Sequence, residues 1–133
     1  MPVKYEGAGY HKRYRSIWGP AKYRSDKTEC PPELGENQVV EVLEVEIQRS
    51  IDSGRCSVER DGEWPRYVWG KTSFLADAGR SGGFHQVGTR FDLCWEARVS
   101  NAGLPVYKAY PVSVDRHSQM MPESVRRFLW PDA

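Results

Sequence analysis

The sequence contains few cysteines and no long apolar run. Its 133 residues include three cysteines, Cys30, Cys56 and Cys94, an odd number without C-x-x-C spacing. This pattern indicates neither a disulfide framework nor a zinc knuckle, so free thiols are expected. The longest apolar stretch is far shorter than the ~18 residues of a membrane span, and basic residues occupy the place of a signal-peptide core. We therefore expect a soluble cytoplasmic protein that does not bind membranes.

A net charge is also nearly absent. Nineteen Lys and Arg residues oppose eighteen Asp and Glu residues, for a formal charge of +1. This excludes a uniformly basic nucleic-acid coat, and five Trp, seven Tyr and four Phe exclude an acidic disordered tail. The charge is nevertheless divided into blocks: +5 over residues 1–27, −7 over 28–64 and +3 over 65–133. A basic N-terminal arm therefore either folds against the acidic middle or lies on an opposite face.

Two short segments near the chain ends predict helices. Residues 9–18 carry one stripe at helical spacing, formed by Tyr10, Tyr14, Ile17 and Trp18. Near the other end, Pro122 occupies a plausible first helical position and precedes the apolar residues Val125, Phe128 and Leu129. Both segments are expected to pack an apolar face on the rest of the domain.

The middle segment, residues 36–51, is ambiguous between helix and strand. Its apolar residues Val39, Leu43, Ile47 and Ile51 lie four apart, as on a helix face. The same region also alternates apolar and polar residues and is rich in valine, which favours a strand. We prefer the helix because Asn37 can cap its start and Gly54 can end it.

The clearest strand signal covers residues 89–101. Its alternation assigns Phe91, Leu93, Trp95, Ala97 and Val99 to one face and Arg90, Asp92, Cys94, Glu96, Arg98 and Ser100 to the other. Residues 106–113 predict a second strand, joined to the first as a hairpin, and residues 66–71 predict a short aromatic strand. Four glycines over residues 76–88 predict a long loop.

These elements predict an α+β fold without internal repeats. A small antiparallel sheet, a meander or hairpin, is packed by an N-terminal helix, a middle helix and a short C-terminal helix. We expect one domain over residues 1–133, with a basic aromatic arm and loop over 1–35 and the α+β core over 36–133.

Candidate catalytic residues lie on the polar face of the predicted hairpin: Glu96, Arg98, Lys108 and Tyr110. A carboxylate can act as a general base and two cations can stabilise a phosphorane, which is what metal-free RNA cleavage needs. His85 or His117 could supply the base instead. The alternative is a solvated sheet face whose charges serve only solubility.

Candidate binding residues are the interleaved aromatic and basic side chains Tyr10, Lys12, Arg13, Arg15 and Trp18, together with Lys71. Rings that stack on unpaired bases and cations that hold phosphates suit single-stranded nucleic acid. The alternative is that the aromatic stripe packs on the sheet. Gly70-Lys71-Thr72 lacks the preceding glycine of a phosphate-binding loop, and no histidine has metal-ligand spacing, so no metal or other cofactor is expected.

Three phrases in the second half of the chain are distinctive: residues 64–70 (WPRYVWG), 95–101 (WEARVSN) and 107–111 (YKAYP). They resemble a family of small uncharacterised domains in actinobacterial, phage and secreted-toxin proteins. A helix followed by an antiparallel meander is also similar to the barnase-like and RelE-like ribonuclease toxins. The opening, residues 9–21, resembles the start of some phage-borne HNH endonucleases, although the metal-binding body of those enzymes is missing.

These resemblances imply a phage or mobile-element setting and leave two functions open. The first is a small non-catalytic binding or inhibitory protein that occupies a host protein or a nucleic-acid complex through exposed aromatic residues. The second is a metal-independent ribonuclease of bacterial toxin type that uses Glu96, Arg98, Lys108 and Tyr110 on RNA. The sequence favours the binding protein slightly.

Overall fold

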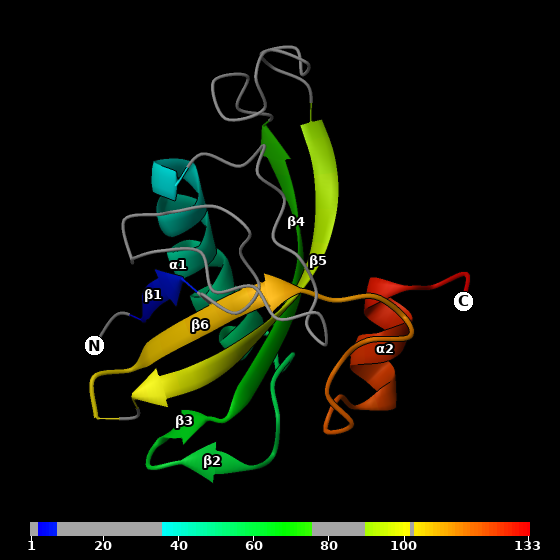
Figure 1. The fold of residues 1–133 in the computed structure, drawn as a ribbon. Helices are drawn as coiled ribbons and strands as arrows, with labels where there is room; N and C mark the ends of the chain where they lie inside the picture. The colour runs from blue at the N-terminus through cyan, green and yellow to red at the C-terminus, as the bar shows by residue number, and fades with distance from the viewer. Residues whose placement is uncertain (1–2, 8–35, 76–89, 102) are drawn as a thin grey trace.

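A four-stranded sheet is the centre of the computed structural model, which describes residues 3–7, 36–75, 90–101 and 103–133 (Figure 1). The strand order is β1-β6-β5-β4, and the strands are β1 (Lys4–Gly7), β4 (Tyr67–Leu75), β5 (Arg90–Asn101) and β6 (Val106–Pro111). A separate two-stranded sheet joins β2 (Arg60–Asp61) to β3 (Trp64–Pro65). With two described helices, α1 (Glu36–Asp52) and α2 (Glu123–Leu129), the fold is α+β.

The sheet is mixed, whereas the sequence predicts an antiparallel one. β4, β5 and β6 form the expected antiparallel meander, and Pro111 ends β6, where a missing N–H is tolerated. β1, however, pairs parallel with β6, with Tyr5 opposite Tyr107. β1 lies in the segment predicted as an arm, and no strand was expected there. A four-residue strand whose partner is distant along the chain has no local signature in the sequence.

Helix α1 covers one face of the sheet and confirms the prediction for the middle segment. Leu43 and Ile47 are buried, whereas Val45 is 56% exposed, so the four-residue spacing and not the alternation describes this segment. Gly54 ends the helix as predicted, with a φ of 79°. The N–H groups of Gly54 and Arg55 donate to the carbonyls of Ile51 and Ser50, at 3.1 and 2.9 Å, the pattern of a Schellman motif.

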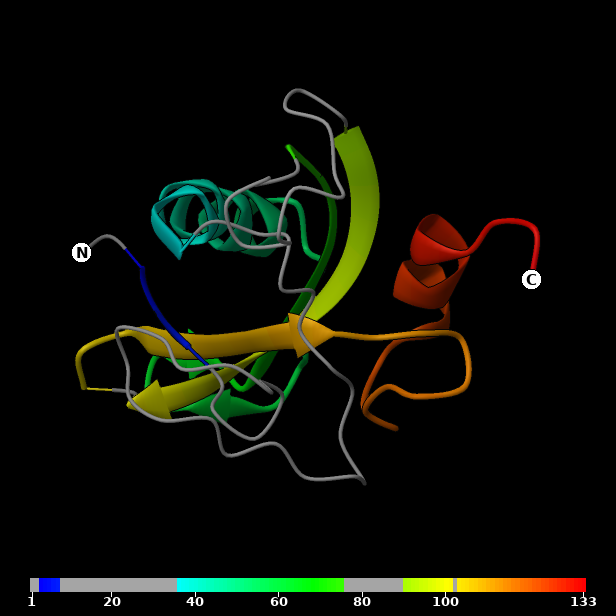
Figure 2. The same ribbon diagram turned by 45° about the horizontal axis from the view of Figure 1, so that its top comes forward.

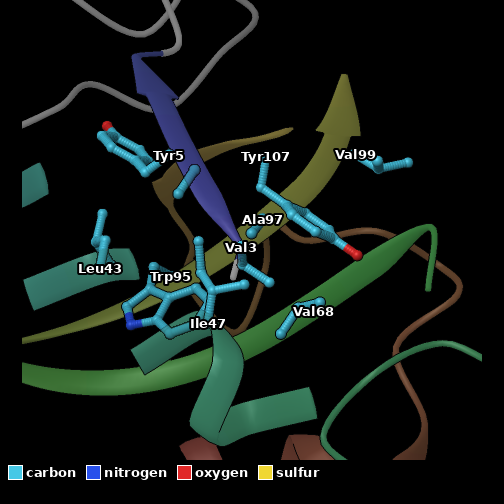
Figure 3. Packing of buried hydrophobic residues seen from close by; sticks show 10 residues of the cluster. Val3, Tyr5, Leu43, Ile47, Val68, Trp95, Ala97, Val99 and Tyr107 are labelled. Atoms are coloured by element: carbon cyan, nitrogen blue, oxygen red, sulfur yellow. The ribbon is translucent and has the colours of Figure 1, made fainter. Parts of the chain in front are cut away.

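The main core lies between α1 and the sheet, and Figure 3 shows its packing. Its buried residues are Val3, Tyr5, Leu43, Ile47, Val68, Trp95, Ala97, Val99, Tyr107 and Ala109. On β5, Trp95, Ala97 and Val99 point into this core, as their alternation predicts. The Phe91 side chain, expected with them, lies outside the described residues. The hydroxyl of Tyr107 donates to the Pro65 carbonyl at 2.6 Å and thus attaches β6 to β3.

Close packing of Trp95 requires glycine on the neighbouring strand. Gly70 of β4 lies opposite Trp95 in the pairing register, and a Cβ at this position would be 2.2 Å from the indole ring. The indole N–H also donates to the Thr72 hydroxyl at 2.9 Å. Gly70-Lys71-Thr72 is therefore a piece of strand against which an aromatic ring packs.

Helix α2 covers part of the opposite face, so the sheet has a helix on each side (Figure 2). Val125 and Leu129 pack with Trp69 in a second core, and Tyr67, Cys94, Met121 and Trp130 lie against it. The sequence places the polar face of β5 here, either as a functional site or as a solvated surface, and the part that carries Trp69 and Cys94 is instead covered by α2. The reason is tertiary, since an amphipathic helix from the chain end covers this part.

The remaining expectations concern α2, the N-terminal arm, the 76–88 loop and membrane spans. Pro122 is the N-cap of α2 and not its first helical residue, and Phe128 is 44% exposed instead of joining the apolar face. The helix expected over residues 9–18, most of the 1–35 arm and the 76–88 loop lie outside the described residues. Neither described helix has the length and apolar composition needed to cross a membrane.

We expect Gly70→Ala to destabilise the fold by about 2–3 kcal/mol, because the added methyl overlaps a ring that is itself fixed between α1 and the sheet. Urea denaturation measures the change. Gly103→Ala is the matched control, since its Cβ would meet nothing closer than 3.4 Å, and we expect it to stay within about 0.5 kcal/mol of the parent. Equal effects of the two variants would contradict the steric argument.

Candidate functional site

Strand register places the predicted catalytic residues in two adjacent rows on the α2 side of the sheet. In one row, Trp69, Glu96 and Tyr110 lie opposite one another on β4, β5 and β6. In the next row, Tyr67, Arg98 and Lys108 do the same. We call these the inner row and the outer row. Side chains two apart on a strand share a face, so the two rows are neighbours on one surface.

Glu96 is the most enclosed member of the inner row. It is 3% exposed, and its carboxylate accepts three hydrogen bonds. The indole N–H of Trp69 and the backbone N–H of Ser118 donate to Oε1, each at 2.8 Å. The hydroxyl of Tyr110 donates to Oε2 at 2.5 Å. One side chain thus connects β4, β5, β6 and the segment before α2.

The surroundings of Glu96 favour the protonated phenol of its neighbour. Burial, together with the charge and the hydrogen bond of Glu96, raises the pKa of Tyr110 above its ordinary value of about 10. Tyr110 therefore remains a donor to the carboxylate at neutral pH. Burial also raises the pKa of Tyr107 on the other face of β6.

Burial corrects the expectation that Glu96 faces an open surface. A general base must come within hydrogen-bond reach of the proton it removes, and here both carboxylate oxygens already accept from the protein. The arrangement makes Glu96 an acceptor that joins secondary-structure elements. Trp69 and Tyr110 beside it are aromatic groups that need a polar partner when buried.

The outer row is more accessible. Arg98 is exposed, and Lys108 and Tyr67 are half-buried. The Arg98 guanidinium lies over the Tyr67 ring, 5.9 Å from its centroid, and Tyr67 stacks on Trp69 at 6.0 Å. Within the described part of the chain, neither Arg98 nor Lys108 forms a salt bridge. The structure thus presents two adjacent cations and one aromatic ring on the open part of the face.

Lys71, predicted to bind a partner, lies on β4 beyond Trp69 and beside α2. Its Nζ is 5.7 Å from the ring centroid of Phe128. The guanidinium carbon of Arg55, from the segment that follows α1, lies 4.6 Å from the same centroid. Sequence reasoning did not include Arg55 or Phe128 in any site, because only the packing of α2 on the sheet brings them to Lys71.

The histidine expectations have different outcomes. The His117 ring stacks on Trp130, with centroids 5.5 Å apart, and its Nδ1 lies 2.9 Å from the Ser118 carbonyl oxygen. The His117 ring thus contacts Trp130 and the carbonyl of Ser118, and it is the N–H of Ser118, its neighbour in the chain, that binds Glu96. His85 lies outside the described residues, as do Tyr10, Lys12, Arg13, Arg15 and Trp18.

The described residues contain no cluster of three or more His, Cys, Asp and Glu side chains that could hold a metal ion. Cys56 and Cys94 are free thiols, both half-buried, and burial raises their pKa values. The Cys94 thiol lies 3.8 Å from the Leu129 carbonyl and contributes to the contact between β5 and α2. Neither thiol has the lowered pKa of a reactive nucleophile.

Comparison of the chain with protein-family models, curated proteins and solved structures finds no match. The functional argument therefore depends on the geometry of the two rows and of the residues around α2.

Removing the Glu96 side chain should cost far more stability than neutralising it. Glu96→Ala leaves three donors without an acceptor, for an expected loss of about 3–5 kcal/mol. Glu96→Gln keeps one carbonyl oxygen for Trp69 and Ser118, and its amide can donate to Tyr110, so we expect a loss of about 1 kcal/mol. Urea denaturation compares both with the exposed control Glu63→Ala. If the Glu96 carboxylate had no structural role, the three variants would have the same unfolding free energy.

The fold should lose stability at alkaline pH through its buried phenols. Because the folded-state pKa values of Tyr107 and Tyr110 are raised, their contribution is complete below about pH 10 and is lost as the pH rises further. Tyr110→Phe should therefore reduce the slope of unfolding free energy against pH above about 10. Urea denaturation at several pH values measures this slope, and a slope identical to that of the parent would contradict the assignment.

Proposed function

We propose that this protein is a small non-catalytic binding protein that occupies a host protein or a nucleic-acid complex through the outer row of its sheet. The observation that carries the proposal is a contrast between neighbouring residues. Glu96 is 3% exposed and fully engaged, whereas Arg98 and Lys108, one row away, are accessible and without a salt bridge among the described residues. The accessible chemistry of the outer row is thus cationic and aromatic, which suits recognition.

The charge of the outer row favours a negatively charged partner surface. Like charges directly opposite on paired strands repel, and Arg98 lies directly opposite Lys108. An anionic partner would relieve this repulsion. Glu6 of β1, which lies opposite Lys108, offsets part of it on one side, whereas the other side carries Tyr67. Arginine and tyrosine are residue types that dominate binding hot spots.

A metal-independent ribonuclease is the second candidate, because Glu96, Tyr110, Arg98 and Lys108 occupy adjacent rows of one sheet face. A base, a phenol and two cations are the groups that this chemistry uses. The enclosed position of Glu96 supports the binding protein over the enzyme. A phage or mobile-element origin would suit an inhibitor of a host factor and stays a prediction.

The test compares retention of ligands by the immobilised protein and by an Arg98→Ala, Lys108→Ala double variant. We expect the variant to retain at least about tenfold less of its specific ligand from a bacterial lysate, identified by mass spectrometry and by nucleic-acid sequencing. The matched control is Lys4→Ala with Arg49→Ala, which also removes two charges but from residues that bind glutamates of α1. Equal retention by the two double variants would contradict the proposal.

A cleavage assay separates the two candidate functions. The binding protein should leave RNA intact in the presence of a chelator of divalent metals. Cleavage by the parent protein that is lost in the folded Glu96→Gln variant would instead establish the ribonuclease.

A further inference from the structure

A second cationic group lies where three elements meet at the β4 edge of the sheet. Arg55 follows α1, Lys71 lies on β4 and Phe128 lies on α2. The backbone carbonyl of Arg55 accepts a hydrogen bond from the backbone N–H of Trp69 at 3.0 Å. That bond holds the Arg55 backbone beside β4, two residues from Lys71. Both cations lie over the Phe128 ring, at 4.6 and 5.7 Å from its centroid. We call these three residues the Phe128 cluster.

Among the described residues, the positive charges of the Phe128 cluster have no acidic counterpart. In the part of the chain that the structure describes, neither Arg55 nor Lys71 forms a salt bridge. Asp92 lies on the same sheet face, opposite Ser73, but is exposed and paired with neither cation. The ring attracts both cations through its face, which offsets only part of their mutual repulsion. A bound anion would supply the missing charge.

Arg55 also carries an unsatisfied donor. Its Nε is buried and has no hydrogen-bond partner, although buried N–H groups of proteins almost always have one. The Nε atom and the two amino groups of a guanidinium form a planar fork that matches the oxygens of a phosphate. A small shift of Arg55 toward an anion at the cluster would give this donor an acceptor.

We propose that Arg55 and Lys71 form a binding site for a phosphate group beside the Phe128 ring. Arg55 supplies the planar fork and Lys71 a point charge, a combination that favours a phosphate with its several oxygens over a halide. The phosphate can be free, at the end of a nucleotide, or within a nucleic-acid strand. The site uses none of the outer-row residues, so it stands or falls independently of the proposed function.

The test is a titration of the isotope-labelled protein with inorganic phosphate, followed by nuclear magnetic resonance at constant ionic strength. We expect saturable shifts of the Arg55 Nε–H and Trp69 amide signals. Lys71→Gln should weaken the apparent affinity by at least about tenfold, whereas Lys4→Gln, the same change at the β1 edge of the sheet, should leave it unchanged. Arg55→Lys, which keeps the charge but removes the fork, should also weaken binding.

Two further titrations identify the source of the phosphate. A short single-stranded oligonucleotide without a terminal phosphate that shifts the same signals indicates a strand, and a response to inorganic phosphate alone indicates a terminal or free phosphate. The proposal is overturned if no signal saturates, if chloride gives the same shifts, or if folded Lys71→Gln binds phosphate like the parent.

Discussion

The carboxylate of Glu96 is the group on which the α2 side of the structure depends. It accepts hydrogen bonds from β4, from β6 and from the segment that leads into α2, and it is itself only 3% exposed. Charge-assisted hydrogen bonds in such surroundings are strong, and an unmatched donor there is costly. The position of the segment before α2, and with it the second core, therefore follows from one side chain.

This enclosure decides which groups of the face can act on other molecules. In the inner row, the polar groups bind one another, and the indole of Trp69 and the phenol of Tyr110 each have a partner in Glu96. In the outer row, Arg98 and Lys108 remain accessible, and at the β4 edge Arg55 and Lys71 meet at Phe128 of α2. The Glu96 carboxylate is thus enclosed while the neighbouring cations Arg98 and Lys108 stay accessible, and the proposed binding function is argued from this contrast.

Much of the layer formed by α1 and the sheet face that it covers could be predicted from local patterns. The four-residue spacing and Gly54 define α1, and the alternation of Trp95, Ala97 and Val99 defines the buried face of β5. The candidate site could be predicted only in part. Glu96, Arg98, Lys108 and Tyr110 do share one face, but Trp69 and Ser118 as partners of Glu96 were not foreseen, because the register and the path of the chain before α2 bring them there.

The amino-acid sequence by itself determined α1, α2, the meander of β4, β5 and β6 and the residues of β5 that share a face, since spacing and alternation act between neighbours along the chain. Only the tertiary structure decided which polar residues of that face meet water. Glu96 and Arg98 are equivalent in the alternation of β5, yet Trp69, Tyr110 and the segment before α2 bind the first, whereas the second is exposed. Burial of a strand's polar face depends on what packs over it, and that element lies elsewhere in the chain.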